Sequence, residues 1–182
     1  MRVPIFQVDA FTRRPFAGNP AAVLVFPSFP ADDIMQAIAA ENNLAETAFL
    51  VGDGDRYRLR WFPLCGHATL AGAAVVMERL EPGRTEVVFD TASGLLPVRR
   101  SGADYALNFP ARPSEPATRS VGLPEALGGM PRGIYVNQFN YMAIFDDAAD
   151  VRRLVPDMAA IARMDRPGVI VSAPGDKGFD FV

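Results

Sequence analysis

The sequence lacks the residues that most often hold metals or cross-link secreted proteins. Among 182 residues there is one cysteine, Cys65, and one histidine, His67. A single cysteine rules out an intrachain disulfide. These two side chains also fall short of the three or four nitrogen and sulfur ligands of a zinc site. The acidic residues show no calcium-loop spacing, and no glycine-rich nucleotide fingerprint follows a predicted strand. We therefore expect no metal and no nucleotide cofactor.

Long apolar runs and basic runs are missing as well. The longest apolar stretches are far too short to span a membrane, and Met1–Phe6 resembles a first strand rather than a signal peptide. We expect a cytoplasmic protein with no membrane partner. The net charge is −3 and the arginine pairs are scattered, so nucleic acid is not an expected partner. The 49% hydrophobic content instead predicts a folded globular chain.

The sequence does contain a series of short strand signals separated by turns. The segment Arg56–Phe62 shows them most clearly, because three apolar side chains alternate with three arginines. Such alternation is typical of a strand with one buried face and one exposed, basic face. In the first part of the chain we predict strands near Pro4–Asp9, Ala21–Phe26, Glu46–Val51, Arg56–Phe62, Glu86–Asp90, Leu95–Arg100 and Asp104–Asn108.

Two helices are predicted among these strands. The first begins at Asp32 and Asp33, whose charges suit a helix N-terminus, and ends near Asn42 and Asn43. The second covers Gly66–Leu80 and carries small apolar residues on nearly every side through its first three turns. Such a helix has to be buried on most faces. We therefore expect a sheet wrapped around it rather than an open doubly wound sheet.

A change in composition divides the chain. Residues 111–118 are rich in proline, arginine, serine and glutamate, which is typical of a linker. We predict a first domain over residues 1–115 and the beginning of a second over residues 119–182, which is not completed by the end of the sequence. The second domain is expected to contain strands near Ile134–Gln138, Tyr141–Phe145, Gly168–Ser172 and Phe179–Val182, with short surface helices near Ala148–Leu154 and Met158–Met164.

Four segments, in order, resemble motifs of the phenazine-biosynthesis PhzF-like isomerases. They are the Gly-Asn-Pro turn in Phe16–Val23, the Asn-Leu-Ala-Glu-Thr-Ala-Phe stretch in Glu41–Leu50, the strand Arg60–Phe62, and the Cys-Gly-His-Ala-Thr helix start in Cys65–Leu70. The sequence departs from the family in two ways. It lacks a short hairpin that family members have after the position of Phe62, and it lacks the segment that supplies the second half of the active site.

The resemblance implies a fold and a function. The fold is α/β of the diaminopimelate-epimerase type, with two pseudo-symmetric domains, each a curled, mostly antiparallel sheet around a central helix. The function is a cofactor-independent isomerisation in which a glutamate moves a proton within a small carboxylate substrate. The family also implies a homodimer. Two alternatives stay open: a two-base racemase or epimerase that uses Cys65, and a non-catalytic carboxylate-binding paralogue.

Glu46 is the candidate catalytic residue. It lies in an otherwise apolar stretch, Leu44–Leu50, where desolvation would raise its pKa toward the range of about 6–7 that suits a general acid/base. From the residues alone, an outward-facing glutamate paired with an arginine is the better interpretation. The resemblance shifts the balance and implies that Glu46 is the acid/base.

Four further residues are candidates for substrate binding. Gly66 and His67 open the second helix, whose free N–H groups can bind a carboxylate. For His67 the alternative is a local helix cap. Cys65 is either a thiol activated by the helix N-terminus or a small buried apolar residue, and the second is favoured. Asn19 is placed near the site by the resemblance, and turn chemistry explains it equally well.

Overall fold

The computed structural model describes residues 2–60, 65–117, 122–176 and 178–182. It divides into two compact units, Met1–Phe109 and Pro110–Val182. The division lies earlier than the expected end of the first domain at residue 115. Glu115 and Pro116 form β8 and pair with a strand of the second unit, so they belong to that unit and not to a linker.

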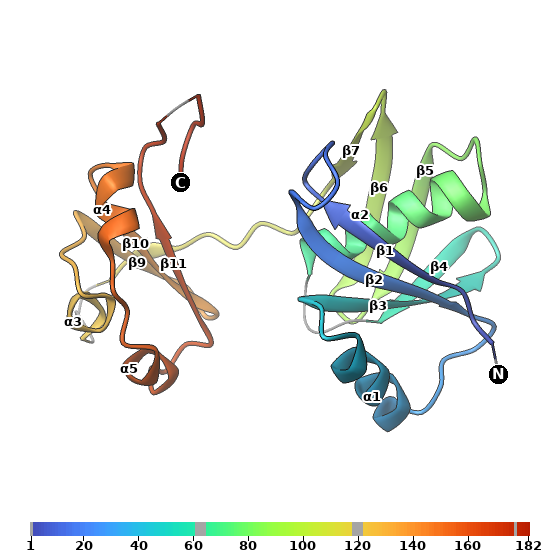
Figure 1. Cartoon of the computed structure of the whole chain (residues 1–182), viewed down its shortest axis with the longest axis horizontal. Coiled ribbons are helices and arrows are strands. Elements are labelled where there is room, and N and C mark those ends of the chain that lie inside the picture. Colours follow the sequence, from blue (N-terminus) through green and yellow to red (C-terminus); the bar gives the residue numbers. More distant parts are fainter. Residues whose placement is uncertain (1, 61–64, 118–121, 177) are drawn as a thin grey trace. The chain divides into compact units, whose positions relative to one another are not determined.

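The first unit is one seven-stranded sheet in which the strands follow each other in sequence order. The pairs β2–β3 and β4–β5 are parallel, and the other neighbours are antiparallel. All seven strands lie where the sequence predicted them, although Trp61 and Phe62 fall outside the described residues. They are β1 (Ile5–Ala10), β2 (Asn19–Phe26), β3 (Glu46–Asp53), β4 (Arg56–Arg60), β5 (Glu86–Thr91), β6 (Gly94–Ser101) and β7 (Asp104–Leu107) (Figure 1).

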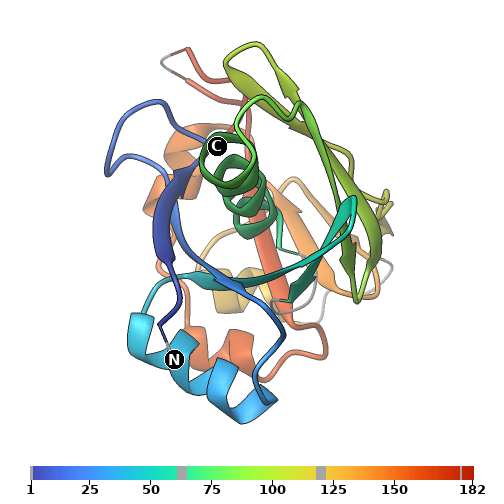
Figure 2. The ribbon, with the colours of Figure 1, turned by 90° about the vertical axis from the view of Figure 1, so that its right-hand side faces the viewer.

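The sheet curls around one helix, as the sequence predicted. Helix α2 (Gly66–Val75) continues through a π-helical turn, η1 (Val76–Leu80), and Figure 2 views it nearly end-on with the strands around it. Its small residues allow the strands to approach closely. An added Cβ at Gly72 would lie 3.6 Å from the side chains of both Leu50 and Phe89. The core therefore consists of the inner side chains of the sheet packed on the buried faces of α2.

Helix α1 (Asp32–Asn42) covers part of the outer face of the sheet. Met35 on this helix packs with Phe26, Phe49 and other outward-facing side chains of β2 and β3. The helix ends at Asn43, which adopts the left-handed backbone conformation (φ 50°, ψ 37°) and donates its N–H to the Ala39 carbonyl. Asparagine tolerates this conformation better than most residues, which explains why the chain turns into β3 here.

The second unit contains a four-stranded sheet in the order β11-β10-β9-β8. Strand β10 is parallel to β11 and antiparallel to β9. The sequence predicted all these elements except β8 and α3, whose single buried turn is too short to show a helical period. The elements are β8 (Glu115–Pro116), α3 (Leu123–Leu127), β9 (Gly133–Val136), β10 (Asn140–Ile144), α4 (Ala148–Arg153), α5 (Met158–Ala162) and β11 (Gly168–Ser172).

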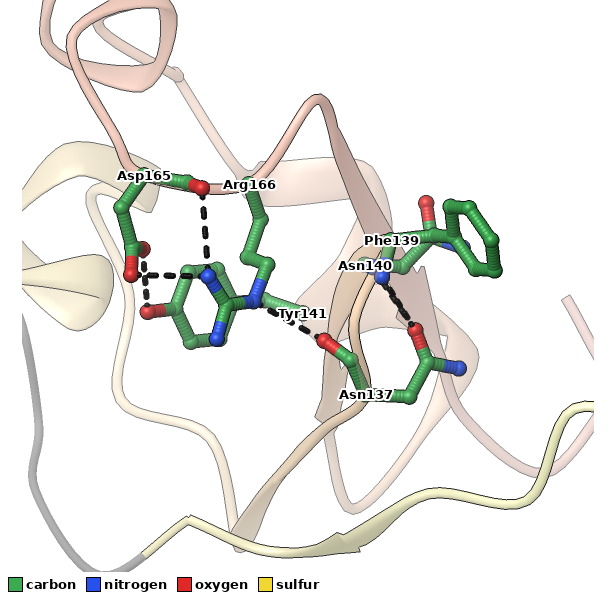
Figure 3. Close-up of polar contacts among 6 residues, drawn as sticks. All are labelled: Asn137, Phe139, Asn140, Tyr141, Asp165 and Arg166. Atoms are coloured by element: carbon green, nitrogen blue, oxygen red, sulfur yellow. Dashed lines mark hydrogen bonds and ion pairs between the residues drawn. The ribbon is translucent and has the colours of Figure 1, made fainter.

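A polar network joins β10 to the segment before β11 (Figure 3). The Tyr141 hydroxyl donates to Asp165 over 2.7 Å, and Arg166 bonds both to Asp165 and to the Asn137 carbonyl. The Asn137 side chain closes the β9–β10 turn by accepting the N–H of Asn140. These bonds satisfy one another and hold the sheet together, so we assign them no role in ligand binding.

One predicted strand is wrong. Phe179–Val182 is not a strand, because only an isolated bridge pairs Phe181 with Pro174. Its apolar side chains suggested a strand, but both phenylalanines are exposed. Among the helices of the described residues, none is long and apolar enough to cross a membrane.

Candidate functional site

Glu46 is the first residue of β3 and points toward the inside of the sheet. Side chains alternate along a strand. Ala48 and Leu50 pack in the core around α2, whereas Phe49 packs on the α1 side. Glu46 shares the face of Ala48 and Leu50, and its neighbour Thr47 turns the other way, toward Asn42 of α1. The Glu46 carboxylate is therefore on the face of the sheet that packs on α2, and its charge acts on Cys65, the N-cap residue of that helix.

The Glu46 side chain is half-buried. No hydrogen bond or ion pair joins it to another residue in the described part of the chain, so the expected alternative of an arginine partner is wrong. Arg60, whose strand pairs with β3, binds Asp32 over 2.7 Å instead. Burial without a compensating charge raises the pKa of Glu46 above its ordinary value. The raised pKa makes this carboxylate a better proton acceptor than an ordinary, fully solvated glutamate.

The start of α2 is held by one contact within the helix and by one from a distant part of the chain. Cys65 is the N-cap residue, in extended conformation, and its carbonyl accepts the Thr69 hydroxyl over 2.7 Å. An added Cβ at Gly66 would lie 3.1 Å from the Phe109 ring, so a larger residue would push that ring aside. The first turn carries no acidic residue, unlike that of α1 with Asp32 and Asp33. The positive end of the helix is therefore not offset by an acidic residue of its own first turn.

His67 presents one bonded and one unbonded ring nitrogen. Nδ1 lies 3.2 Å from the Cys65 Sγ. Nε2 is buried and has no hydrogen-bond partner in the described part of the chain. Burial lowers the pKa of the imidazole, so the ring is neutral at neutral pH. A buried polar nitrogen without a partner is unusual, and a ligand that accepts or donates a hydrogen bond would satisfy it.

Cys65 lies between the two groups. The pKa of its thiol is raised to about 11, mainly by burial and in smaller part by the charge of Glu46, although the backbone amides of Ala68 and His67 act to lower it. The charge of the Glu46 carboxylate thus acts on the thiol. At neutral pH the thiol is protonated, which agrees with the interpretation of Cys65 as a small, unreactive residue.

Asn19 is on the same side of the sheet as Glu46. It is the first residue of β2, and Ala21, two residues along on the same face, pairs with Glu46 in the parallel ladder. Its side chain is exposed, and no contact to Glu46 or His67 is present. Its role in binding stays a prediction.

Two hollows lie in this unit. One, of about 460 Å³, is bordered by Glu46, Thr47, Arg60 and residues of α1. The other, of about 690 Å³, lies between β1, α2 and β7 and contains none of the candidate residues. We therefore place the candidate site at Glu46 and the start of α2 from the chemistry of the side chains rather than from the size of a hollow.

Two residues that support the site had no predicted role. Thr69 is fully buried and fixes the Cys65 carbonyl. The threonine lies within the matched motif, four residues after the cysteine, and this spacing could have identified it as a first-turn capping contact. Phe109 packs on Gly66 from beyond β7. No local signal in the sequence connects residues so far apart.

The unpaired carboxylate has a consequence for stability. The pKa of Glu46 is raised above its ordinary value of 4.5, so the folded protein binds this proton more readily than the unfolded chain does. Protonation of Glu46 therefore stabilises the folded protein. This contribution is fully present when the pH is below the ordinary pKa and is lost as the pH rises through the pKa of the folded state. Glutamine resembles the protonated form. We expect Glu46→Gln to raise the denaturation midpoint at neutral pH, with the difference from wild type shrinking as the pH falls to 4.5.

The control is Glu41→Gln, because Glu41 is exposed on α1 and changes the net charge equally. Urea unfolding of the three proteins across this pH range measures the effect. A Glu46→Gln protein that is less stable than wild type at neutral pH would contradict the desolvated state of the carboxylate.

Comparison with known proteins gives a consistent picture. Residues 8–180 match the family model described as phenazine biosynthesis-like protein. An uncharacterized isomerase of Pseudomonas aeruginosa is 46% identical, over 100% of this chain and 72% of that relative. A crystal structure of a phenazine biosynthesis protein of the PhzF family from Enterococcus faecalis superposes with a TM-score of 0.88 at 38% identity, over 100% of this chain and 72% of the other. A predicted epimerase from P. aeruginosa shares the fold, with a TM-score of 0.71 at 23% identity, over 95% of this chain and 70% of that one.

Proposed function

Because this chain belongs to the phenazine biosynthesis-like protein family and is an isomerase of that family, we propose that it moves a proton within a small carboxylate substrate, with Glu46 as the general acid/base. The observation that carries the proposal is the desolvated Glu46 carboxylate, which has no partner among the described residues and whose charge acts on the N-cap residue of α2. A glutamate with a raised pKa takes a proton from an acidic carbon and returns it to another position of the same molecule.

The start of α2 supplies the other half of the proposal. The Gly66 amide and the partial positive charge of the helix end favour an anion. The unpartnered Nε2 of His67 adds a hydrogen-bonding group at the same place. A substrate carboxylate held there would place the neighbouring carbon near Glu46 and would be stabilised as negative charge develops during proton removal. Gly66 and His67 would thus bind the substrate, with Cys65 next to them as the N-cap residue of α2 and Asn19 at the edge of the site.

The two-base alternative receives less support. A thiol base has to be present as the thiolate, and the pKa of Cys65 is raised to about 11 by burial. The same thiol contacts Nδ1 of His67, whereas a thiol base would have to face the substrate carbon. The homodimer and the cytoplasmic location expected from the sequence stay predictions.

A small carboxylate should bind at the start of α2. Titration of ¹⁵N-labelled protein with tartrate or acetate should shift the backbone amide signals of Gly66 and His67, and soaked crystals should show the anion there. His67→Ala should weaken binding roughly 2- to 10-fold, as expected for the loss of one neutral hydrogen bond.

The start of α1 is the internal control for this titration. It is also a helix N-terminus, but Asp33 already accepts the amide of Ile34, and its charge together with that of Asp32 repels anions. The α1 amides should therefore not respond. Equal shifts at both helices would indicate general anion association and would count against the site.

A further inference from the structure

The only cysteine and the only histidine of the chain contact each other. The Cys65 Sγ lies 3.2 Å from His67 Nδ1, within hydrogen-bond distance for sulfur. This contact has two possible directions. Either the thiol donates its proton to Nδ1, or Nδ1–H donates to the sulfur. The direction matters, because in the neutral ring the proton that is absent from one nitrogen is carried by the other.

The surroundings of the sulfur decide the direction. The amides of Ala68 and His67 point their positive ends at Sγ, as their effect on the thiol shows. A third N–H donor, from Nδ1, would be repelled by these two. The imidazole nitrogen is also a better acceptor than a thiol sulfur, and the thiol stays protonated at neutral pH. We therefore orient the thiol hydrogen away from the amides and along the 3.2 Å contact toward Nδ1.

We propose that Cys65 is a positioning residue whose Sγ–H donates to His67 Nδ1, so that the ring proton stays on Nε2 and Nε2–H becomes a donor for the substrate carboxylate. The buried Nε2, which has no partner in the described part of the chain, is the group that this arrangement prepares. The identity of the ligand rests on the function proposed above, but the position of the proton does not.

The single histidine makes the test direct, because its two ring nitrogens give the only imidazole signals. Long-range ¹H–¹⁵N correlation spectra of the ligand-free protein at neutral pH distinguish a protonated ring nitrogen from an unprotonated one. We expect Nε2 protonated and Nδ1 unprotonated in the wild type. Protonated Nδ1 in the wild type would overturn the proposal.

Two variants distinguish a role of Cys65 in orienting His67 from a role in packing alone. Cys65→Ala removes the donor and should shift both ring signals toward the values of an exchanging tautomer mixture. Cys65→Ser keeps a donor at this position and should restore the wild-type pattern. Backbone ¹H–¹⁵N spectra establish that each variant is folded. Ring signals that are unchanged in a folded Cys65→Ala protein would also overturn the proposal.

Carboxylate titration of the same three proteins tests the ligand separately. Tartrate binding should be roughly 2- to 10-fold weaker in Cys65→Ala and recovered in Cys65→Ser, because one oriented donor is lost and then replaced. Ring signals that respond as expected while no protein binds tartrate or acetate would refute the carboxylate site of the proposed function and leave the positioning role of Cys65 in place.

Discussion

Glu46→Gln should lower turnover by about 10²–10⁴-fold, the usual effect of losing a general acid/base. Glutamine has nearly the same size as glutamate and can still form hydrogen bonds, but it cannot take up and return a proton. The side chain is half-buried and has no partner among the described residues, so no ion pair is lost and the fold should stay intact. Small carboxylates with an acidic C–H group can be screened in D₂O, where ¹H NMR follows loss of the C–H signal and formation of the isomer.

Two variants accompany this measurement. Glu41→Gln removes an exposed carboxylate from α1 and should leave turnover unchanged. Cys65→Ala should be much milder than Glu46→Gln, because the thiol orients His67 and does not itself move the proton. Wild-type turnover by Glu46→Gln would end the proposal for this residue. A Cys65→Ala protein that is stable but as inactive as Glu46→Gln would favour the two-base alternative.

Phe89→Ala should lower the free energy of unfolding by about 3–5 kcal/mol, the usual range for a fully buried phenylalanine. Phe89 lies on β5 and is completely buried. Its ring contacts Tyr57 edge-on, with the ring centroids 6.5 Å apart, and faces Gly72 of α2. The glycine cannot fill the space that the ring would leave, so a cavity should persist between the sheet and the helix.

Leu95→Ala on the adjoining strand β6 is the matched control. Leu95 is 51% exposed, so its truncation should change stability by no more than about 0.5 kcal/mol. Chemical denaturation followed by far-UV circular dichroism compares both variants with the wild type. Similar stability of Phe89→Ala and the control would show that the core around α2 is not packed as described.

The pattern of apolar and polar residues in the first unit was sufficient to predict most of its strands and helices. Two-residue alternation in Arg56–Arg60 appears as a strand with buried Tyr57 and Leu59 and exposed arginines. The small apolar residues of Gly66–Val75 predicted a helix surrounded by sheet, and that part of the prediction is confirmed. The likeness to solved structures also confirms the predicted diaminopimelate-epimerase type of fold. Prediction failed at Phe179–Val182, where apolar residues lack the neighbouring strand that would complete a ladder.

The sequence by itself determined which chemical groups the site can contain and which elements carry them. It identified Glu46 in an apolar stretch and a Cys-Gly-His turn at the start of a buried helix, because residue type and periodicity are local properties. Only the tertiary structure decided that the carboxylate is partly desolvated, has no described partner and acts through its charge on the thiol. It also decided that Nδ1 of His67 meets Sγ while Nε2 is left without a partner in the described part of the chain. These properties depend on strand register and on the packing of α2 inside the sheet. The burial of Glu46 and His67 results from packing between segments far apart in the chain, which no local pattern encodes.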